Sequence, residues 1–398
     1  MIMISSKKNL QMSLIALFAF GFSFGQTFIQ GYANVVNQCS QTNITSNLTE
    51  FEALGVKRRG TPALQNTLDW LKNEYLSYGY IADQMTEDSY LNNGFTCKNL
   101  ILTKVGTVYP NTYVIVCGHY DSITGTGTND NGSGTVAILE IARLLQNIPT
   151  EYSIKFINFS GEEDGLRGSQ HYVTSVVNST TPKMDIRVVF NLDEVGGVAG
   201  LTNDTITCER DTGSPTANNA ASNTKTQELI TCTQLYSPLN TFLASAYASD
   251  YMTFEENSEI ITGFFEKNQT AHRHTATDLL VNMDPVYNYN IAKAATGATM
   301  HFAVANTAVL SNELFNEDNQ VSFFPNPAKG ILNINRGIIT DANYTFSIVD
   351  INGKTILRQA FTTTNLIETV NVSELSSGMY LGVFETATNR ITKKIIIE

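Results

Sequence analysis

Apolar residues along the chain form short continuous runs that alternate with helix-like repeats. Three apolar runs have the length of buried strands, at residues 112–117, 153–159 and 187–192. Within 61–78, apolar residues recur at helical spacing behind Thr61 as the N-cap and Pro62 at the first helical position. Residues 135–145 and 286–308 show the same helical spacing. The pattern therefore predicts strands that alternate with helices.

The order of these elements indicates the fold class. The helical segment 135–145 lies between the first two apolar runs. A strand–helix–strand unit with the usual right-handed crossover makes its two strands parallel. We therefore expect an α/β protein, a three-layer α/β/α sandwich with a mostly parallel central sheet.

The pattern changes after a polar stretch at 311–320, which we interpret as a linker. Residues 321–398 contain short β-type runs, turn signals such as Asn326-Pro327 and Asn352-Gly353, and few helical repeats. This composition predicts a small C-terminal β-sandwich.

The first 25 residues have the order of a secretory signal peptide. Two lysines precede an apolar stretch at 12–24 that ends in small residues. We therefore expect residues 1–25 to be a signal peptide, and a buried N-terminal helix is the alternative. The main domain then covers 26–310, in which 26–50 is either part of the domain or a leader or propeptide.

Composition excludes several functional classes. The chain has 25 Lys and Arg against 37 Asp and Glu, a formal net charge of −12, and no basic run. A nucleic-acid binder is therefore excluded, and a hydrophobic content of 42% excludes a disordered acidic chain. After the first 25 residues no apolar run is long enough to span a bilayer, so we expect no transmembrane span.

Five cysteines would lie in an oxidising compartment if the chain is exported. None of them forms a CxxC pair, which argues against a zinc ribbon. The odd number leaves at least one free thiol, and Cys117 within an apolar run is our choice for it. Cys208 and Cys232 flank a polar loop that a disulfide would close, and the sequence leaves their pairing open.

Acidic residues or histidines follow each of the three apolar runs. The first run leads to His119 and Asp121, the second to Glu162-Glu163 and the third to Asp193. Because ligands bind beyond the carboxyl ends of strands in α/β sheets, we expect these side chains to converge. Carboxylates that meet repel one another, so a cation is needed to hold them there. Imidazole and carboxylate together favour zinc over magnesium or calcium.

The adjacent pair Glu162-Glu163 suggests a division of roles. Neighbouring side chains on an extended segment point in opposite directions. One carboxylate should therefore bind metal, while the other faces the substrate side as a general base.

Five motifs carry a resemblance to a known family. In chain order they are GHYDS (118–122), TNDNGSG (128–134), SGEEDG (160–165), NLDEVG (191–196) and HRHTATD (272–278). Together they resemble the secreted bacterial co-catalytic dizinc, leucyl-type aminopeptidases, over about 60–308. The resemblance implies a fold of the zinc exopeptidase type, two Zn²⁺ per chain and a cis peptide after Asp130.

The resemblance also implies a role for individual residues. Asp130 would bridge both zinc ions, His119 and Asp193 would complete one site, and Glu163 and His274 the other. Glu162 matches the general base that activates a water shared by the two zinc ions. Asp121 matches the acid that supports the His119 imidazole.

Several assignments stay open at this stage. His272 lies two residues before His274 and is the alternative ligand, although Thr275 and Asp278 match the family spacing after His274. Arg273 stands where relatives often have an aromatic residue, so the oxyanion donor is undecided between two tyrosines, Tyr247 and Tyr251. Glu194 is either a contact for the substrate α-amine or a solvated acid. His171 and His301 fall on helical segments and are expected to be packing or surface residues.

The C-terminal region carries a second resemblance. Its motifs are FFPNPAKG (323–330), SSGMY (376–380) and the basic-apolar end KKIII (393–397). In this order they resemble a type IX secretion sorting domain, and a carbohydrate-binding or adhesive β-sandwich is the alternative. The resemblance implies contact with secretion machinery and export across the outer membrane of a Gram-negative bacterium.

The sequence thus predicts a secreted, monomeric metallo-aminopeptidase that hydrolyses N-terminal residues from peptides and proteins. The first alternative is a glutaminyl cyclase-like acyl transferase on the same fold. Such cyclases tend to use one zinc and a Trp-lined pocket, whereas the only tryptophan here, Trp70, lies on the early helix away from every motif. The second alternative is a non-catalytic, peptidase-like binding protein. The sequence leaves the preferred N-terminal residue and the native metal open.

Overall fold

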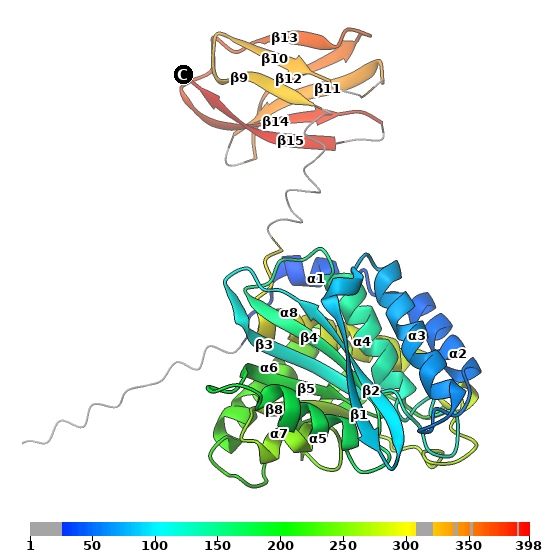
Figure 1. Ribbon diagram of the computed structural model, residues 1–398. Helices are drawn as coiled ribbons and strands as arrows, with labels where there is room; N and C mark the ends of the chain where they lie inside the picture. Colours follow the sequence, from blue (N-terminus) through cyan, green and yellow to red (C-terminus); the bar gives the residue numbers. More distant parts are fainter. Residues whose placement is uncertain (1–25, 308–320, 337–338, 340, 351–352, 388–389) are drawn as a thin grey trace, which may run out of the picture. The chain divides into compact units, whose positions relative to one another are not determined.

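The structure is a computed structural model, and it describes residues 26–307, 321–336, 339, 341–350, 353–387 and 390–398. The chain divides into two compact units, one that ends at Ala305 and one that begins at Asn306 (Figure 1). The predicted signal peptide at 1–25 and linker at 311–320 lie outside the described residues.

The larger unit is built on a mixed eight-stranded sheet. Its strands are β1 (Met85–Asn92), β2 (Phe95–Lys104), β3 (Tyr109–His119), β4 (Tyr152–Phe159), β5 (Asp185–Leu192), β6 (Thr205–Arg210), β7 (Asn240–Ser245) and β8 (Ile261–Glu266). They follow the order β1-β2-β4-β3-β5-β8-β6-β7. The central strands β4, β3, β5 and β8 are mutually parallel, as predicted.

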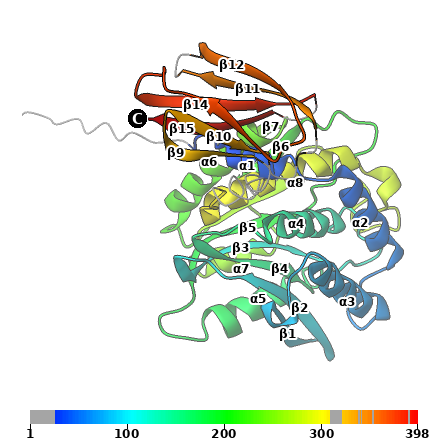
Figure 2. The same cartoon turned by 90° about the horizontal axis from the view of Figure 1, so that it is seen from above.

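Helices cover both faces of this sheet. One face carries α1 (Gln30–Val36), α2 (Gln41–Ala53), α3 (Pro62–Ser77), α4 (Gly132–Leu145), α6 (Asn219–Tyr236) and α8 (Pro285–Ala303). The short helices α5 (Arg167–Tyr172) and α7 (Tyr251–Glu256) lie on the other face (Figure 2). The predicted three-layer α/β/α sandwich is therefore confirmed.

The three predicted strands and the predicted helix 135–145 lie within longer observed elements. The predicted helices 61–78 and 286–308 are longer than the observed ones, because α3 spans Pro62–Ser77 and α8 ends at Ala303, where Val304 takes a left-handed conformation. The three apolar runs are the buried parts of β3, β4 and β5. Helix α4 begins at Gly132, three residues before the predicted start, because Asn131 caps it through a side-chain bond to the backbone N–H of Gly134. The hairpin β1–β2 and strand β7 were not predicted, since β1 and β7 lie at the sheet edges and carry many exposed positions.

The N-terminal helices belong to the core of the larger unit. Ile44, Leu48 and Phe51 of α2 are fully buried, and α2 packs against α4 and α8. The ring of Phe51 lies edge-to-face with Trp70 of α3, with ring centroids 6.1 Å apart. Residues 30–50 therefore contribute core contacts to the folded domain.

All five cysteines are buried free thiols. Cys117 is one of them, as predicted. Cys208 of β6 and Cys232 of α6 are not joined by a disulfide, so the loop closure considered from the sequence is absent. Both side chains are completely buried, because each packs as a small apolar group between the sheet and α6.

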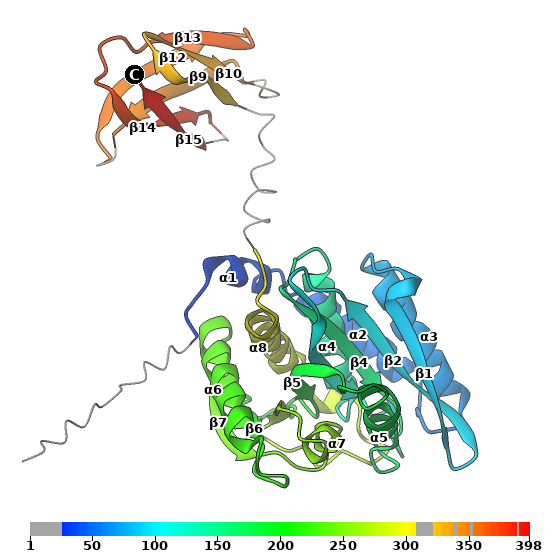
Figure 3. The ribbon, with the colours of Figure 1, turned by 60° about the vertical axis from the view of Figure 1, so that its left-hand side comes forward.

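The smaller unit is a β-sandwich (Figure 3). Its strands are β9 (Ser322–Lys329), β10 (Ile331–Asn335), β11 (Asn343–Val349), β12 (Thr355–Thr362), β13 (Ile367–Asn371), β14 (Gly378–Glu385) and β15 (Arg390–Ile397). The groups β12-β11-β14-β15 and β9-β10-β13 are antiparallel, and one parallel pair, Ile397 with Ala328, joins them. Phe323, Phe346 and Phe384 belong to the core between them.

No helix within the described part of the chain is long and apolar enough to cross a membrane.

Candidate metal centre and its pocket

The carboxyl ends of three neighbouring parallel strands position the candidate site. His119 is the last residue of β3, and it lies in register with Phe159 at the end of β4. Glu162 and Glu163 follow β4, and Asp193 follows β5 directly. Because these strands are parallel neighbours, the side chains that follow them emerge at the same edge of the sheet. The predicted convergence is therefore observed.

Asp130 enters the site from the loop before α4. The N-terminus of α4 comes close to the end of β5, because the side-chain amide of Asn131 donates to the carbonyl of Leu192 over 2.9 Å. Two glycines permit this approach. A Cβ on Gly118 or Gly134 would lie 2.6 or 2.3 Å from the same Leu192 carbonyl oxygen.

The loop 272–278 completes the site. The carboxylate of Asp278 accepts hydrogen bonds from the backbone N–H groups of Asn129 and Asp130, over 2.8 and 3.1 Å. This contact ties the loop that carries His274 to the loop that carries Asp130. His274 has a φ of 57°, in the left-handed region that non-glycine residues seldom adopt. His272 lies apart from the cluster, and its Nδ1 is 2.8 Å from Oγ1 of Thr277.

The structure brings six side chains together in two groups with metal-ligand spacing. One group is His119, Glu162 and Asp193, and the other is Asp130, Glu163 and His274. Oδ1 of Asp130 lies 3.3 Å from Nε2 of His119, while its Oδ2 lies 3.0 Å from Nε2 of His274. The carboxylate of Asp130 thus faces both groups at once, which is the arrangement of a bridging ligand.

The two adjacent glutamates occupy different places. Oε2 of Glu163 lies 3.0 Å from Nε2 of His274. Oε2 of Glu162 lies 3.9 Å from Nε2 of His119, which is further than any other carboxylate facing that nitrogen. The geometry separates a close carboxylate from a more distant one, in line with the two roles expected from the sequence.

The charges in the cluster are not balanced by the chain itself. Burial disfavours a charged His119, but the carboxylates of Asp193 and Glu162 outweigh it and raise the His119 pKa well above its usual range. Burial raises the pKa of Glu163 to about 8, and the nearby Asp130 carboxylate adds to this effect. Acids held this close need added positive charge.

A metal ion fits these donors. Nε2 of His119 and Oδ1 of Asp193 lie 3.4 Å apart, and neither has a hydrogen-bond partner among the described residues. Buried polar atoms normally have partners, so two unpaired acceptor atoms that face each other indicate a missing cation. The mixed imidazole and carboxylate set is typical of zinc.

Two residues outside the ligand groups fix their orientation. Nδ1 of His119 lies 3.2 Å from the backbone carbonyl oxygen of Asp121 and 3.6 Å from its carboxylate. That carboxylate accepts the backbone N–H groups of Glu162 and Glu163 over 3.2 and 3.4 Å. The hydroxyl of Ser249 donates to Oδ2 of Asp193 over 2.6 Å, which leaves Oδ1 facing His119. Such contacts fix ligand rotamers and raise metal affinity.

A pocket of about 200 Å³ opens beside the cluster. Its lining is Asp130, Glu162, Asp193, Glu194, Glu209, Tyr247, Ala248, Ser249, Tyr251, Phe265, Arg273 and His274. Glu194 is buried and pairs with Nη1 of Arg273 over 3.1 Å, so it is not the solvated acid considered from the sequence. The Tyr251 hydroxyl donates to Oε2 of Glu209 over 2.6 Å, whereas Tyr247 is half exposed at the pocket mouth.

Ser249 and Glu209 were not predicted from the sequence as residues of the site. Asp278 was predicted only as part of a motif, without a structural role. Ser249 and Glu209 come from segments that follow no predicted strand, so no sequence signal linked them to the cluster. Trp70 does not line the pocket. Its indole N–H instead donates to Oε2 of Glu50 over 3.0 Å.

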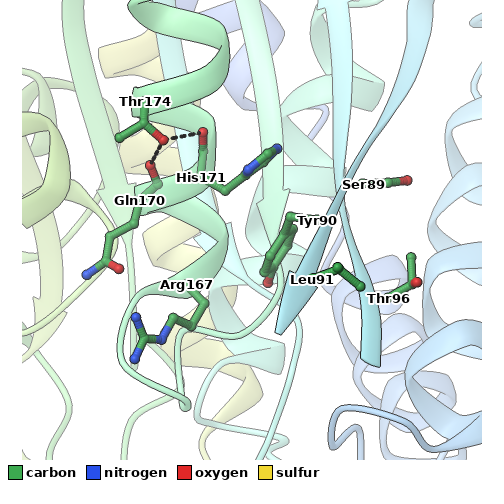
Figure 4. A pocket seen from close by; sticks show the side chains of 8 residues that line it. All are labelled: Ser89, Tyr90, Leu91, Thr96, Arg167, Gln170, His171 and Thr174. Atoms are coloured by element: carbon green, nitrogen blue, oxygen red, sulfur yellow. Dashed lines mark hydrogen bonds between the residues drawn. The ribbon is translucent and has the colours of Figure 1, made fainter. Parts of the chain in front are cut away.

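A second groove lies away from the cluster, between β1 and α5 (Figure 4). His171 pairs there with Asp88 over 3.0 Å and stacks on the ring of Tyr90. His301 packs against Tyr32, and its Nε2 lies 2.9 Å from the hydroxyl of Tyr236. Both histidines therefore have packing roles, as expected.

Comparison with known proteins places this geometry in a family. Residues 99–299, half of the chain, match the model of peptidase family M28, and residues 322–398 match the secretion system C-terminal sorting domain. Among curated relatives, the aminopeptidase YwaD of Bacillus subtilis is 42% identical over 103 residues, which are 25% of this chain and 22% of YwaD. A probable zinc metalloprotease of Pyrenophora teres is 27% identical over 191 residues, 42% of this chain and 39% of the relative.

Solved structures show the same fold. The LapA aminopeptidase of Legionella pneumophila has a TM-score of 0.61 at 18% identity, covering 74% of this chain and 77% of LapA. A glutaminyl cyclase of Fimbriiglobus ruber has a TM-score of 0.54 at 13% identity, covering 66% of this chain and 95% of the cyclase. The chain spans less than half the length of the two curated relatives. The chain belongs to peptidase family M28 and carries a secretion system C-terminal sorting domain at its C-terminal end.

Proposed function

We propose that this protein is a secreted, zinc-dependent aminopeptidase that removes N-terminal residues from peptides. The observation that carries the proposal is the Asp130 carboxylate, whose two oxygens face two separate ligand groups. The names of two relatives, an aminopeptidase and a probable zinc metalloprotease, support the same reading. Two zinc ions per chain would be held by five residues: His119, Asp130, Glu163, Asp193 and His274.

Zinc, when bound, supplies a Lewis acid for the scissile carbonyl and lowers the pKa of water in the site. Glu162 is the general base in this proposal. Its carboxylate stands further from His119 than the other acids and lines the pocket, so it can take a proton from water and return it to the leaving amine. Asp121 keeps the His119 ring in place through its contact with Nδ1.

The pocket supports exopeptidase action. It is small, about 200 Å³, and its lining includes the buried residues Glu194, Glu209 and Tyr251. A space of this size accepts one side chain of a substrate. The C-terminal domain supports export by secretion machinery, and we propose that export crosses the outer membrane of a Gram-negative bacterium.

A paired assay on the purified, zinc-loaded protein tests this function. Elemental analysis should give about two zinc ions per chain. Leu-p-nitroanilide should be cleaved, while its N-acetylated analogue should not. The Glu162→Gln variant should bind the same amount of zinc and lose activity by about a hundredfold or more. Cleavage of the blocked substrate would contradict the aminopeptidase assignment, and cyclisation of an N-terminal Gln peptide without hydrolysis would favour the cyclase.

A further inference from the structure

The pocket beside the candidate metal centre holds one carboxyl group more than metal binding and internal ion pairs account for. Two divalent cations would offset the three ligand carboxylates and Glu162. Glu194 already pairs with Arg273. Glu209 is the pocket carboxylate that remains, and no Lys, Arg or His of the described chain forms an ion pair with it.

Glu209 is also buried in an unusual way. Its exposed fraction is 3%, and within the described residues its carboxylate accepts one side-chain hydrogen bond, which the hydroxyl of Tyr251 donates to Oε2. Burial raises the pKa of Glu209 to about 8, against the lowering effect of the Tyr251 hydrogen bond. A desolvated carboxylate with one neutral donor is costly, and a cation beside it would offset that cost.

The position of Glu209 suits the end of a long substrate side chain. Glu209 lies on β6, which is separated from β5 and its metal-ligand end by the single strand β8. Neighbouring strands lie about 4.8 Å apart, so β6 lies about 10 Å from β5. The α-amine and scissile carbonyl of a substrate belong near the ligands, and a four-carbon stem reaches from there towards β6.

Part of the pocket lining is apolar. Phe265 and Ala248 line the pocket together with the ring of Tyr247, and the rings of Tyr247 and Phe265 lie 6.1 Å apart. A pocket lined by apolar groups and a buried carboxylate matches a side chain with an aliphatic stem and a charged head.

Resting on the aminopeptidase function proposed above, we propose that Glu209 selects substrates with a basic N-terminal residue, lysine or arginine. The head group of that residue pairs with the carboxylate that Tyr251 orients, and its stem lies along Phe265. Glu194 stays paired with Arg273. The preferred substrate class is therefore set by β6, a strand outside all of the metal-binding motifs.

The experiment compares lysine with norleucine, which has a linear stem of the same length without the ammonium group. On the zinc-loaded full-length protein, calorimetry measures binding of the free amino acids, and kcat/KM is measured for the two p-nitroanilides. We expect lysine to be favoured over norleucine by about tenfold or more in both measurements. Glu209→Gln should reduce this preference by about tenfold or more. Glu255→Gln removes a buried carboxylate of α7 that does not line the pocket, and it should leave the preference unchanged.

The outcomes separate this inference from the proposed function. If the norleucine substrate is hydrolysed and the lysine substrate is hydrolysed equally well or less well, the inference is overturned. The aminopeptidase function then stays intact. An unchanged preference in Glu209→Gln would overturn it as well. Hydrolysis of neither substrate would overturn the proposed function. In that case, calorimetry on the wild-type protein still measures whether the pocket binds lysine more tightly than norleucine. This measurement does not depend on whether a variant folds.

Discussion

Side chains in the two candidate ligand groups are held in place by neighbours outside those groups. Ser249 illustrates this, because its hydroxyl donates to Asp193 over 2.6 Å and accepts from the amide of Asn191 over 2.8 Å. All three side chains are buried, so the network has one low-energy arrangement. The free oxygen of Asp193 is thereby directed at His119 rather than left to rotate.

The Ser249→Ala variant should therefore bind zinc less tightly. Losing such a contact typically costs about 10- to 100-fold in metal affinity, and the Asn191 amide would also lose its acceptor. Competition with a chromophoric chelator measures the affinity directly. Ser175→Ala, which changes an exposed serine near α5, is the control and should bind zinc like the wild type. Equal affinities for both variants would show that Asp193 holds its rotamer without Ser249.

Elements far from the ligands determine whether the site can form. Helix α2 packs on α4, the helix that begins beside Asp130. Phe51 lies so close to Gly132 that a Cβ there would be 2.6 Å from its ring. The N-terminal segment is therefore part of the support of the bridging ligand, and we infer that removing residues 26–50 as a propeptide would unfold the larger unit.

A single substitution in α2 tests this inference. Leu48 is completely buried, so Leu48→Ala should lower the free energy of unfolding by about 2–5 kcal/mol. Leu76 on α3 is 44% exposed, and Leu76→Ala should cost about 0.5 kcal/mol or less. Urea titration of both variants gives the two values. A small cost for Leu48→Ala would mean that α2 is dispensable and would restore the propeptide interpretation.

His301, which lies where α1, α6 and α8 meet, should make the free energy of unfolding depend on pH. Burial lowers the pKa of His301 from 6.5 to about 4. His301 therefore binds a proton more readily in the unfolded chain than in the folded chain. The stability contributed by neutral His301 is full above pH 6.5 and is lost as the pH falls towards 4.

Replacing this histidine should flatten that dependence. His301→Gln keeps a polar group beside the hydroxyl of Tyr236 and removes the titration. Between pH 6.5 and 4 the unfolding free energy of the wild type should fall more steeply than that of the variant, by up to about 1.4 kcal/mol per pH unit. Chemical unfolding at several pH values, with chelator present, measures the difference. Parallel curves would show that His301 titrates normally in the folded chain.

At the scale of the whole molecule, the two units have separate cores. The sandwich encloses its own apolar cluster, which includes Phe323, Phe346 and Phe384. A chain that stops at Asn306 should therefore keep the zinc content and the melting temperature of the larger unit. Scanning calorimetry should show two transitions for the full chain and one for the shortened chain. Loss of zinc binding on truncation would show instead that the larger unit depends on the sandwich.

The sequence by itself determined the layers of the fold and the ligand groups. Strands β3, β4 and β5 are continuous apolar runs, and the residues that follow them lie at one sheet edge because the strands are parallel. His119, Glu163 and Asp193 follow these strands and are close in space for this reason. Asp130 and His274 lie on other loops, and it was the resemblance to a known family that predicted their place in the two groups. The choice between His272 and His274 rested on the family motif, and the fold then directed only His274 at the cluster.

Tertiary structure alone decided what surrounds the ligands. Glu209 and Ser249 reach the pocket from β6 and from the segment before α7, and neither lies in a motif. The edge strand β7 could not be predicted either, because it is largely exposed and lacks an apolar run. A local sequence pattern shows which residues of a strand are buried. A pocket, in contrast, is formed by side chains from several strands, and the order of these strands in space differs from their order in the sequence. That spatial order, β5-β8-β6, places the carboxylate of Glu209 in the pocket beside the candidate metal centre.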